Sequence, residues 1–334
     1  MPLRVAVVGA GLMGRWHADA AERCGAEVAA VVDVDAAAAE ALAARRGRRS
    51  VRTFRDLATC LEDCAVDVVH VCTPSATHGP PARTAVETGC HVLVEKPLTD
   101  SVAETDALLL LAAGAGVKVN PVHQFPFQPG VRALLERRSE LGDIVRVAFR
   151  TSSAGGAGWS AEERRALIAD IVPHPVSLFQ RFAPGFDPAG LEIEVRDEDL
   201  VLAGRHGRVF LEAFITLRGR PPCNELHLTG TRASALADLF HGYAVFDRGP
   251  ASGLGKATRP FVLGTRLLAG ASFNGVSRAV RLESAYPGLR RLVGAFYRSV
   301  QDGSPPPISA DEITAAAVVR DAVLARLRRI PAVR

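Results

Sequence analysis

The chain has 334 residues, 40 of them basic and 36 acidic, which gives a formal net charge of +4. That length favours two domains, and so small a net charge argues against a protein built to bind nucleic acid. Hydrophobic residues make up 48% of the sequence, enough for a large core. The longest apolar stretch, at 107–117, is shorter than the about 20 residues of a membrane span.

The six cysteines show neither a CxxC pair nor the spacing of a zinc finger. This favours free thiols and a cytoplasmic protein, because disulfides persist in oxidising compartments. The one dense basic cluster, Arg45 to Arg49, has no aromatic residues between its arginines. We therefore expect a solvated helix face there and no nucleic-acid site.

The first third of the chain alternates β-branched runs with alanine-rich helical patterns. Parallel strands are predicted at residues 3–8, 27–32, 66–71, 91–94 and 117–119, with helices at 13–23, 36–46, 80–88 and 102–113. Because strand–helix–strand units cross over with a right hand, this order predicts an α/β fold. Residues 1–122 are expected to form a doubly wound Rossmann domain.

The pattern changes after residue 122. A helix to about residue 138 and a strand at 144–150 are followed by a Gly/Ser-rich loop at 152–158. Antiparallel strands with tight turns are predicted at 200–203, 208–217, 225–229 and 233–239, and helices at 289–301 and 311–328. Residues 123–334 are thus expected to form an α+β domain, whose last helices are candidates to pack back on the first domain.

A glycine fingerprint follows the first predicted strand. Gly9, Gly11 and Gly14 form G-x-G-x-x-G, with Leu12 and Met13 opening the next helix. The glycines permit a tight turn, a close approach of the backbone to a pyrophosphate, and close packing of helix on strand. A pyrophosphate would bind at the helix N-terminus, where free N–H groups and the helix dipole favour an anion.

Asp33 ends the second predicted strand, about 20 residues beyond the glycines, where an acidic residue binds the adenosine ribose. Its carboxylate would accept hydrogen bonds from both ribose hydroxyls and repel a 2′-phosphate, and Val34 supplies no positive charge. The sequence therefore favours NAD over NADP. Asp33 is also a candidate N-cap of the following helix.

Further candidates lie where other strands end, the edge at which open α/β sheets bind ligands. Thr73 and Pro74 follow the strand at 66–71, and Glu95 and Lys96 follow the strand at 91–94. Thr73 and Pro74 are candidates to contact the ribose or the nicotinamide. The alternative is that they only form a turn. Lys96 is one of three lysines in the chain and is a candidate for a role in catalysis. The alternative is that Lys96 lies on the surface and forms an ion pair with Glu95.

Asp170 and His174 stand four residues apart, a spacing that places both on one side of a helical turn. Pro173 makes a regular helix through His174 doubtful, and Pro175 fits the start of a new helix. We therefore expect His174 at a helix break, where its side chain can reach a pocket.

Several of these segments resemble the glucose-fructose oxidoreductase/inositol dehydrogenase/MocA (Gfo/Idh/MocA) family. They are T-P-S-A-T-H at 73–78, G-C-H-V-L-V-E-K-P-L at 89–98, H-Q-F-P-F-Q-P at 123–129, D-x-x-x-H at 170–174, and the turn from Asp302-Gly303 to Ser309. The E-K-P element with a downstream D-x-x-x-H is the selective part, because glycine fingerprints occur in many folds.

The resemblance implies a second domain with an open, largely antiparallel sheet, and substrate between that sheet and the nicotinamide. Lys96 would polarise the reacting oxygen, His174 would exchange its proton, and Asp170 would position the substrate or the imidazole. These roles fit the chemistry, because an alcohol needs a base to lose its proton and an ammonium stabilises an alkoxide. His123 is a candidate substrate contact or strand cap. His78 is a candidate cofactor contact, although local packing or hydrogen bonding is the stronger expectation.

Three residues depart from the family pattern. Cys90 stands where the family frequently has Lys, and Val172 stands where it frequently has Gly. Pro126 replaces the Arg of the family's H-x-x-R-F-x-P segment. Val172 and Pro126 lie near the predicted pocket and leave the substrate open. The expected reaction interconverts a secondary alcohol and a ketone on a sugar, cyclitol or secondary-metabolite intermediate.

Two alternatives use the same scaffold: reduction of an imine or conjugated system, and a non-catalytic NAD-sensing protein. The joint presence of Lys96, Asp170 and His174 favours catalysis over sensing. A metal-dependent hydrolase lacks a visible ligand cluster, and no metal is predicted. Because an open sheet with one apolar face has to be covered, we expect a homo-oligomer, a dimer or a tetramer.

Overall fold

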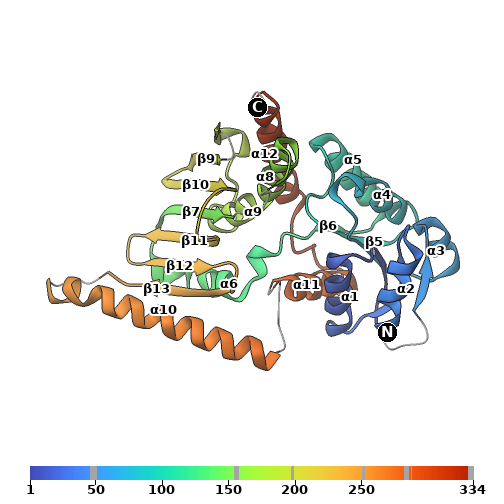
Figure 1. Ribbon diagram of the computed structural model, residues 1–334, viewed down its shortest axis with the longest axis horizontal. Coiled ribbons are helices and arrows are strands. Elements are labelled where there is room, and N and C mark those ends of the chain that lie inside the picture. The colour runs from blue at the N-terminus through green and yellow to red at the C-terminus, as the bar shows by residue number, and fades with distance from the viewer. Residues whose placement is uncertain are drawn as a thin grey trace. The chain divides into compact units, whose positions relative to one another are not determined.

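The computed structural model describes residues 1–45, 51–153, 158–196, 199–249, 253–281, 286 and 288–329. The chain divides into two compact units, one of residues 1–123 and 289–317 and the other of residues 124–288 and 318–334. Figure 1 labels their elements. Most of the arginine cluster and most of the Gly/Ser-rich loop lie outside the described residues.

The first unit contains a six-stranded parallel sheet in the order β3-β2-β1-β4-β5-β6. Its strands are β1 (Arg4–Val8), β2 (Glu27–Val32), β3 (Arg52–Phe54), β4 (Val68–Val71), β5 (His91–Val94) and β6 (Val119–Pro121). Its helices are α1 (Leu12–Arg23), α2 (Ala36–Ala44), α3 (Leu57–Asp63), α4 (Gly79–Glu87), α5 (Val102–Ala115) and α11 (Leu289–Asp302), with the short η1 (Ser75–Thr77). The strand order changes direction between β1 and β4, where doubly wound sheets bind ligands at the strand ends. The predicted Rossmann fold is confirmed.

Local signals account for these elements. The central strands are mostly apolar because both faces of a parallel sheet are covered, and Val5, Val7 and Val69 are completely buried. Helix α5 begins at Ser101, whose hydroxyl accepts the Glu104 amide, and ends at Gly116 in a left-handed conformation.

The second unit contains a seven-stranded mixed sheet in the order β13-β12-β11-β7-β10-β9-β8. Its strands are β7 (Ile144–Ser152), β8 (Glu192–Arg196), β9 (Asp199–His206), β10 (Val209–Thr216), β11 (Cys223–Gly230), β12 (Ser234–Asp238) and β13 (Tyr243–Asp247). Only β7 and β10 pair in parallel, so the sheet is largely antiparallel, as the family resemblance implies.

Helices cover one face of this sheet. They are α6 (Pro129–Glu136), α7 (Arg138–Leu141), α8 (Ala161–Ile171) and α9 (Pro173–Phe182), with the short η2 (Phe125–Phe127) and η3 (Pro188–Gly190). The strand residues on the covered face, such as Phe149, Leu202 and Leu226, are buried. The opposite face carries mixed side chains, including the ion pair of Arg146 with Glu212 and the half-buried Leu236. This face is therefore not purely apolar, contrary to the expectation.

Two more helices complete the chain. Helix α10 (Gly253–Arg281) packs on the edge strand β13. Helix α12 (Ala310–Leu327) begins in the first unit and ends in the second. The main elements absent from the sequence prediction are β3, α3, α8, β8, β13 and α10, together with the short η1, η2, α7 and η3. No helix in the described part of the chain is long and apolar enough to cross a membrane.

Candidate active site

The glycine fingerprint forms the turn from β1 into α1. Gly9 has a φ of +98°, and a Cβ there would lie 2.7 Å from the carbonyl of Cys72 at the end of β4. A Cβ on Gly14 would lie 1.9 Å from the Gly9 carbonyl oxygen. Both positions therefore require glycine, the first for its backbone conformation and both for the close packing of the turn.

The turn also leaves room for an anion. A Cβ on Gly11 would meet nothing within 4 Å, and Gly11 is the N-cap of α1 without a side-chain capping bond. The first turn of α1 carries no acidic residue, and Leu12 beside it is 62% exposed. An open helix N-terminus without a negative charge fits a dinucleotide pyrophosphate, which would accept hydrogen bonds from the amides of this turn.

Asp33 follows β2 and joins it to the glycine turn. Its Oδ2 accepts the Ala10 amide at 2.7 Å, and its Oδ1 accepts the Asp35 amide at 2.9 Å. The N-cap of α2 is Asp35, whose carboxylate accepts the amides of Ala37 and Ala38. The interpretation of Asp33 as that N-cap is therefore wrong. Its carboxylate lies instead against the backbone of the cofactor turn, beside the exposed Val34.

The loops after β4 and β5 are joined by His78. The buried imidazole lies 2.6 Å from the Pro97 carbonyl oxygen through Nδ1 and 2.9 Å from the Thr73 carbonyl oxygen through Nε2. Thr77 closes the turn after β4 by donating its hydroxyl to the Pro74 carbonyl. His78 thus ties the Thr73–Pro74 loop to the loop that carries Lys96, as a local hydrogen-bonding residue would. Lys96 itself is half-buried.

A buried chain of polar side chains supports the Lys96 loop. Glu95 Oε2 accepts the Lys96 amide at 3.2 Å, and Glu95 Oε1 lies 3.0 Å from His17 Nε2. His17 Nδ1 lies 3.0 Å from His70 Nδ1, and His70 Nε2 lies 2.9 Å from the Tyr297 hydroxyl. Four side chains, from α1, β4, the loop after β5 and α11, thus form one hydrogen-bonded network, called here the histidine relay.

The protonation states of the histidine relay are mutually consistent. Burial, and next the charge of His17, hold the pKa of His70 well below its usual value. Burial raises the pKa of Tyr297 well above 10, so its hydroxyl remains a donor. Every bond of the relay is satisfied when Tyr297 donates to His70, His70 to His17, and His17 to Glu95.

The carboxylate of Glu95 accepts at the end of the relay. Burial alone would raise the pKa of Glu95, but the hydrogen bond and charge of His17, together with the Lys96 ammonium, lower it below its usual value. An ionised Glu95 therefore holds the backbone of the Lys96 loop.

The sequence prediction missed His17, His70 and Tyr297. Two signals could have identified the histidines. His17 lies on the buried stripe of α1 with Gly14 and Ala18, and His70 interrupts an otherwise apolar strand that is covered on both faces. A buried imidazole on such elements needs a hydrogen-bond partner.

Asp170 and His174 lie in the second unit, at adjoining ends of α8 and α9. The second helix begins at Pro173, not at Pro175, and Val172 between the helices keeps a helical conformation. At the expected helix break, α8 is therefore followed directly by α9, and no unwound segment separates the two helices. Asp170 Oδ1 lies 3.3 Å from Arg320 Nη2 of α12, so the carboxylate is paired with a nearly buried guanidinium.

The imidazole of His174 is stacked on a phenyl ring. The ring centroids of Phe125 and His174 are 4.2 Å apart, with 23° between the ring planes. Phe125 belongs to the H-Q-F-P-F-Q-P segment, and its buried ring also contacts Phe149 of the sheet. This segment therefore orients His174 through Phe125. Pro126, which replaces the family's Arg, is buried within η2.

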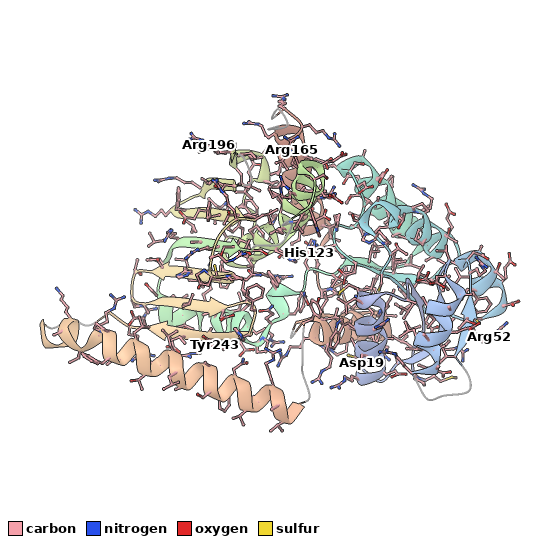
Figure 2. All side chains as sticks on the ribbon, viewed as in Figure 1. Asp19, Arg52, His123, Arg165, Arg196 and Tyr243 are labelled. Carbon is pink, nitrogen blue, oxygen red and sulfur yellow. The ribbon has the colours of Figure 1, made fainter. Side chains whose placement is uncertain are left out.

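His123, labelled in Figure 2, follows β6 and is 3% exposed. Its backbone amide donates to the Pro121 carbonyl. Lys96 and His123 belong to the first unit, and Asp170 and His174 to the second. That all four residues contact one substrate is therefore a proposal.

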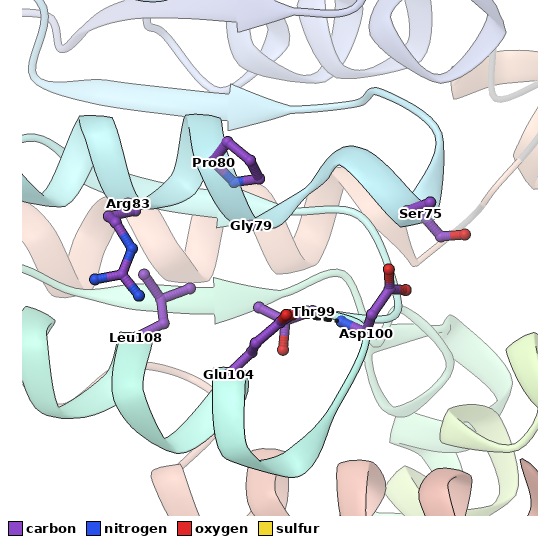
Figure 3. A pocket seen from close by; sticks show the side chains of 9 residues that line it. Ser75, Gly79, Pro80, Arg83, Thr99, Asp100, Glu104 and Leu108 are labelled. Carbon is purple, nitrogen blue, oxygen red and sulfur yellow. Dashed lines mark hydrogen bonds between the residues drawn. The ribbon is translucent and has the colours of Figure 1, made fainter.

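A separate hollow of about 410 Å³ lies on the first unit between α4 and the start of α5 (Figure 3). Arg83, Asp100 and Glu104 lie on its rim, and Leu108 lines it. None of the predicted site residues lines this hollow. Among the residues that the structure describes, no three His, Cys, Asp or Glu side chains are grouped as metal ligands.

Comparison with known proteins identifies the first unit. Residues 3–123 match the model of GFO_IDH_MocA, an oxidoreductase family with an NAD-binding Rossmann fold. The chain is similar to an inositol 2-dehydrogenase of Corynebacterium glutamicum, with 38% identity over 52% of this chain and 51% of that protein. It is also similar to 4-carboxy-2-hydroxymuconate-6-semialdehyde dehydrogenase of a Sphingobium species, with 29% identity over 53% of this chain and 58% of that protein. The chain spans about half the length of the curated relatives it matches.

Solved structures match almost the whole chain. A levoglucosan dehydrogenase, solved in complex with NADH and levoglucosan, superposes with a TM-score of 0.76 and covers 98% of each chain at 17% sequence identity. At this identity the likeness shows the fold, including the mixed sheet of the second unit.

Proposed function

We propose that the chain belongs to the Gfo/Idh/MocA oxidoreductase family, whose model its residues 3–123 match, and that it transfers a hydride between NAD and a secondary alcohol or ketone. The observation that carries this proposal is the arrangement at the strand ends of the first unit. There the glycine turn, Asp33 and the Lys96 loop lie at the edge where doubly wound sheets bind dinucleotides. When bound, the nicotinamide accepts or donates the hydride.

The side chains of the chain supply the proton chemistry. His174 takes the hydroxyl proton of an alcohol, or returns it to a ketone, because an imidazole titrates near neutral pH. The Lys96 ammonium stabilises the negative charge that develops on the same oxygen. Asp170, held by Arg320, binds a substrate hydroxyl or orients His174, and His123 is a further substrate contact.

NAD is the proposed cofactor, with NADP disfavoured. The Asp33 carboxylate is fixed by two backbone amides, and the adjacent Val34 is 78% exposed and uncharged. A fixed negative charge repels the 2′-phosphate of NADP and accepts hydrogen bonds from the ribose hydroxyls of NAD. Glu95 contributes indirectly, through the backbone of the Lys96 loop.

The proposed substrate is a sugar, a cyclitol or a related secondary-metabolite intermediate. Support comes from the similarity to inositol 2-dehydrogenase. We further propose a cytoplasmic homo-oligomer, a dimer or a tetramer. The thiols support that location, because all six cysteines are unpaired. The exposed apolar side chains of α10, such as Phe261 and Leu268, support the oligomer.

The proposal is tested with a panel of sugars, cyclitols, their keto forms and semialdehydes, while nicotinamide absorbance is followed. Wild type is expected to turn over at least one polyol or ketone with NAD or NADH. Lys96→Ala and His174→Ala are each expected to lower kcat by at least about 100-fold. Lys256→Ala, at an exposed lysine on α10, is the matched control and keeps wild-type rates.

Two results would contradict the proposal. Full turnover by Lys96→Ala would remove the assigned role of the lysine. Tight NADH binding without turnover of any compound would instead favour the non-catalytic sensing function.

A further inference from the structure

Helix α10 is an unusual element of the second unit, because little in its own domain stabilises it. It runs for 29 residues and contains Pro260 and the glycines at 264, 270 and 275 in its interior. Each interior glycine costs about 1 kcal/mol relative to alanine, and proline costs more. None of its described side chains is buried, and a cavity of about 390 Å³ borders its contact with β13.

The side of α10 that faces the sheet carries the half-buried Leu263 and Leu267 together with several polar side chains. Arg259 forms an ion pair with Asp247, and Arg266 donates to the Phe246 carbonyl. Further along, Asn274 and Arg278 both donate to the His241 carbonyl.

Gly270 marks the centre of this inner side. A Cβ there would lie 3.3 Å from the side chains of Tyr243 and Val245. Both residues belong to the edge strand β13; Figure 2 labels Tyr243. Three basic side chains of α10, those of Arg259, Arg266 and Arg278, are thus directed at its own domain.

The outward side of α10 is apolar. At about 100° per residue, the half of the helix opposite Gly270 carries Phe261, Leu268 and Val276 and contains no charged residue from 253 to 281. Phe261 is 78% exposed, Leu268 70% and Val276 65%. Val262, Phe273 and Val280 extend the same surface along one flank and are also exposed. We call these six side chains the α10 stripe.

An amphipathic helix normally buries its apolar side and presents its charges to water. In α10, Arg259 and Arg266 contact β13 while large apolar side chains on the outward side are exposed. The outward side therefore requires a partner. Contiguous exposed apolar surface of this kind marks an interaction site. A lipid surface fits poorly, because surface-bound helices direct basic residues at anionic headgroups, whereas Arg259 and Arg266 contact β13.

We propose that the α10 stripe is the interface with a second copy of this chain, formed by two α10 helices packed antiparallel about a two-fold axis near Leu268. A two-fold interface must be self-complementary, and an uncharged apolar stripe meets this condition with its own copy. A register centred on Leu268 places Phe261 of one copy opposite Gly275 of the other, so that a large side chain meets a small one.

The size of the surface agrees with a stable dimer. A helix of 29 residues is about 44 Å long. Six exposed side chains of this size offer on the order of 500 Å² of apolar area per copy. A standard interface buries about 800 Å² per partner, of which a little over half is apolar.

The first test is the oligomeric state in solution, measured by sedimentation velocity over a range of micromolar concentrations. Wild type is expected to be a dimer or a larger even assembly. Leu268→Glu and Phe261→Glu, which bury a charge at the interface, are expected to weaken association at least about 100-fold. Leu110→Glu on α5, at another exposed leucine, is the matched control and leaves the assembly unchanged. NADH binding by each variant reports whether it is folded.

The second test is cross-linking through introduced cysteines. Leu268→Cys is expected to form a covalent dimer on oxidation, because the two copies of residue 268 meet at the axis. Thr258→Cys is expected not to, because ten residues from the axis place its two copies about 30 Å apart. Wild type, with its six native cysteines, supplies the background.

The inference rests on the homo-oligomer part of the proposed function and not on hydride transfer. Three outcomes would overturn it: a monomeric wild type, an assembly that persists in both glutamate variants, or a monomer that binds vesicles of anionic phospholipid through α10. If the assembly persists in the variants, the homo-oligomer stands and only the α10 interface fails.

Discussion

The imidazole of His174 and the phenyl ring of Phe125 are stacked with their centroids 4.2 Å apart. Phe125 is thereby the residue that fixes the plane of the proposed acid–base group. Because Phe125 is 6% exposed and also contacts Phe149, its own position is set by the core of the second unit. The apolar core of this unit thus determines the orientation of a functional side chain.

Removing this ring should impair catalysis without impairing cofactor binding. Phe125→Ala is expected to lower kcat/KM by at least about 10-fold, because a base that loses its fixed orientation transfers a proton less efficiently. The dissociation constant of NADH, measured by fluorescence, should remain within about twofold of wild type. Phe125→Tyr, which keeps the aromatic stack, serves as the control. An equal loss of kcat/KM in both variants would show that the aromatic stack does not determine catalysis.

The histidine relay should contribute to the stability of the first unit. Tyr297→Phe removes the hydroxyl that is hydrogen-bonded to His70 and leaves a buried nitrogen without its partner. The free energy of unfolding is expected to fall by about 1–3 kcal/mol in urea titrations. Tyr243→Phe is the matched control, because Tyr243 is only half-buried. An unchanged unfolding free energy in Tyr297→Phe would mean that the hydroxyl adds nothing to folding.

The histidine relay also predicts that the protein becomes less stable to unfolding as the pH falls. The pKa of His70 is well below 6.5 in the folded protein, so below pH 6.5 the unfolded chain binds a proton that the folded chain does not. The stabilisation is therefore complete above pH 6.5 and decreases as the pH falls towards the folded-state pKa. Glu95, with a lowered pKa, adds a further loss below about pH 4.5.

This acid sensitivity is measured by urea unfolding at about pH 7.5 and about pH 5.5. The loss of stability between the two is expected to be smaller in His70→Asn than in wild type. His91, whose pKa burial also lowers, contributes equally to both proteins. The difference between the two proteins therefore isolates His70, and equal losses would show that His70 is not the group responsible.

The carboxylate of Asp33 should decide cofactor preference. Asp33→Asn keeps an oxygen acceptor for the Ala10 amide but removes the negative charge. The ratio of NADPH to NADH dissociation constants is expected to fall by at least about 10-fold, mainly because NADPH binds better. Asp35→Asn, at the N-cap of α2, controls for loss of a nearby charge. The assignment fails if both variants shift the ratio equally.

Much of the fold can be predicted from the sequence, because periodic apolar runs and terminal signals agree. Strands β2 and β5 and the start of α5 have the predicted limits, and the glycine fingerprint identified the first domain. The three-residue β3 is too short for a periodic signal. Helix α8 begins with a capping box, Ser160 with Glu163, which is a signal of a helix start within the sequence itself.

Other features depend on tertiary contacts. Helix α10 escaped prediction because Pro260 and its glycines argue against a helix and its apolar side faces outward. The chain of bonds from Tyr297 to Glu95 joins residues up to 227 positions apart. Its histidines appear scattered in the sequence, and only the packing of α1, β4 and α11 brings them together. Spacing likewise could not show that Phe125 stacks on His174.

The most direct test of the central claim is isotope transfer from the cofactor to the product. NADH carrying deuterium at C4 of the nicotinamide is incubated with the protein and a ketone that it reduces, and the product is analysed by mass spectrometry. The account predicts deuterium on the carbon that bears the new hydroxyl, in wild type and in Lys256→Ala, with almost none formed by Lys96→Ala in the same time. A product that carries no deuterium when either face of the cofactor is labelled would contradict direct hydride transfer.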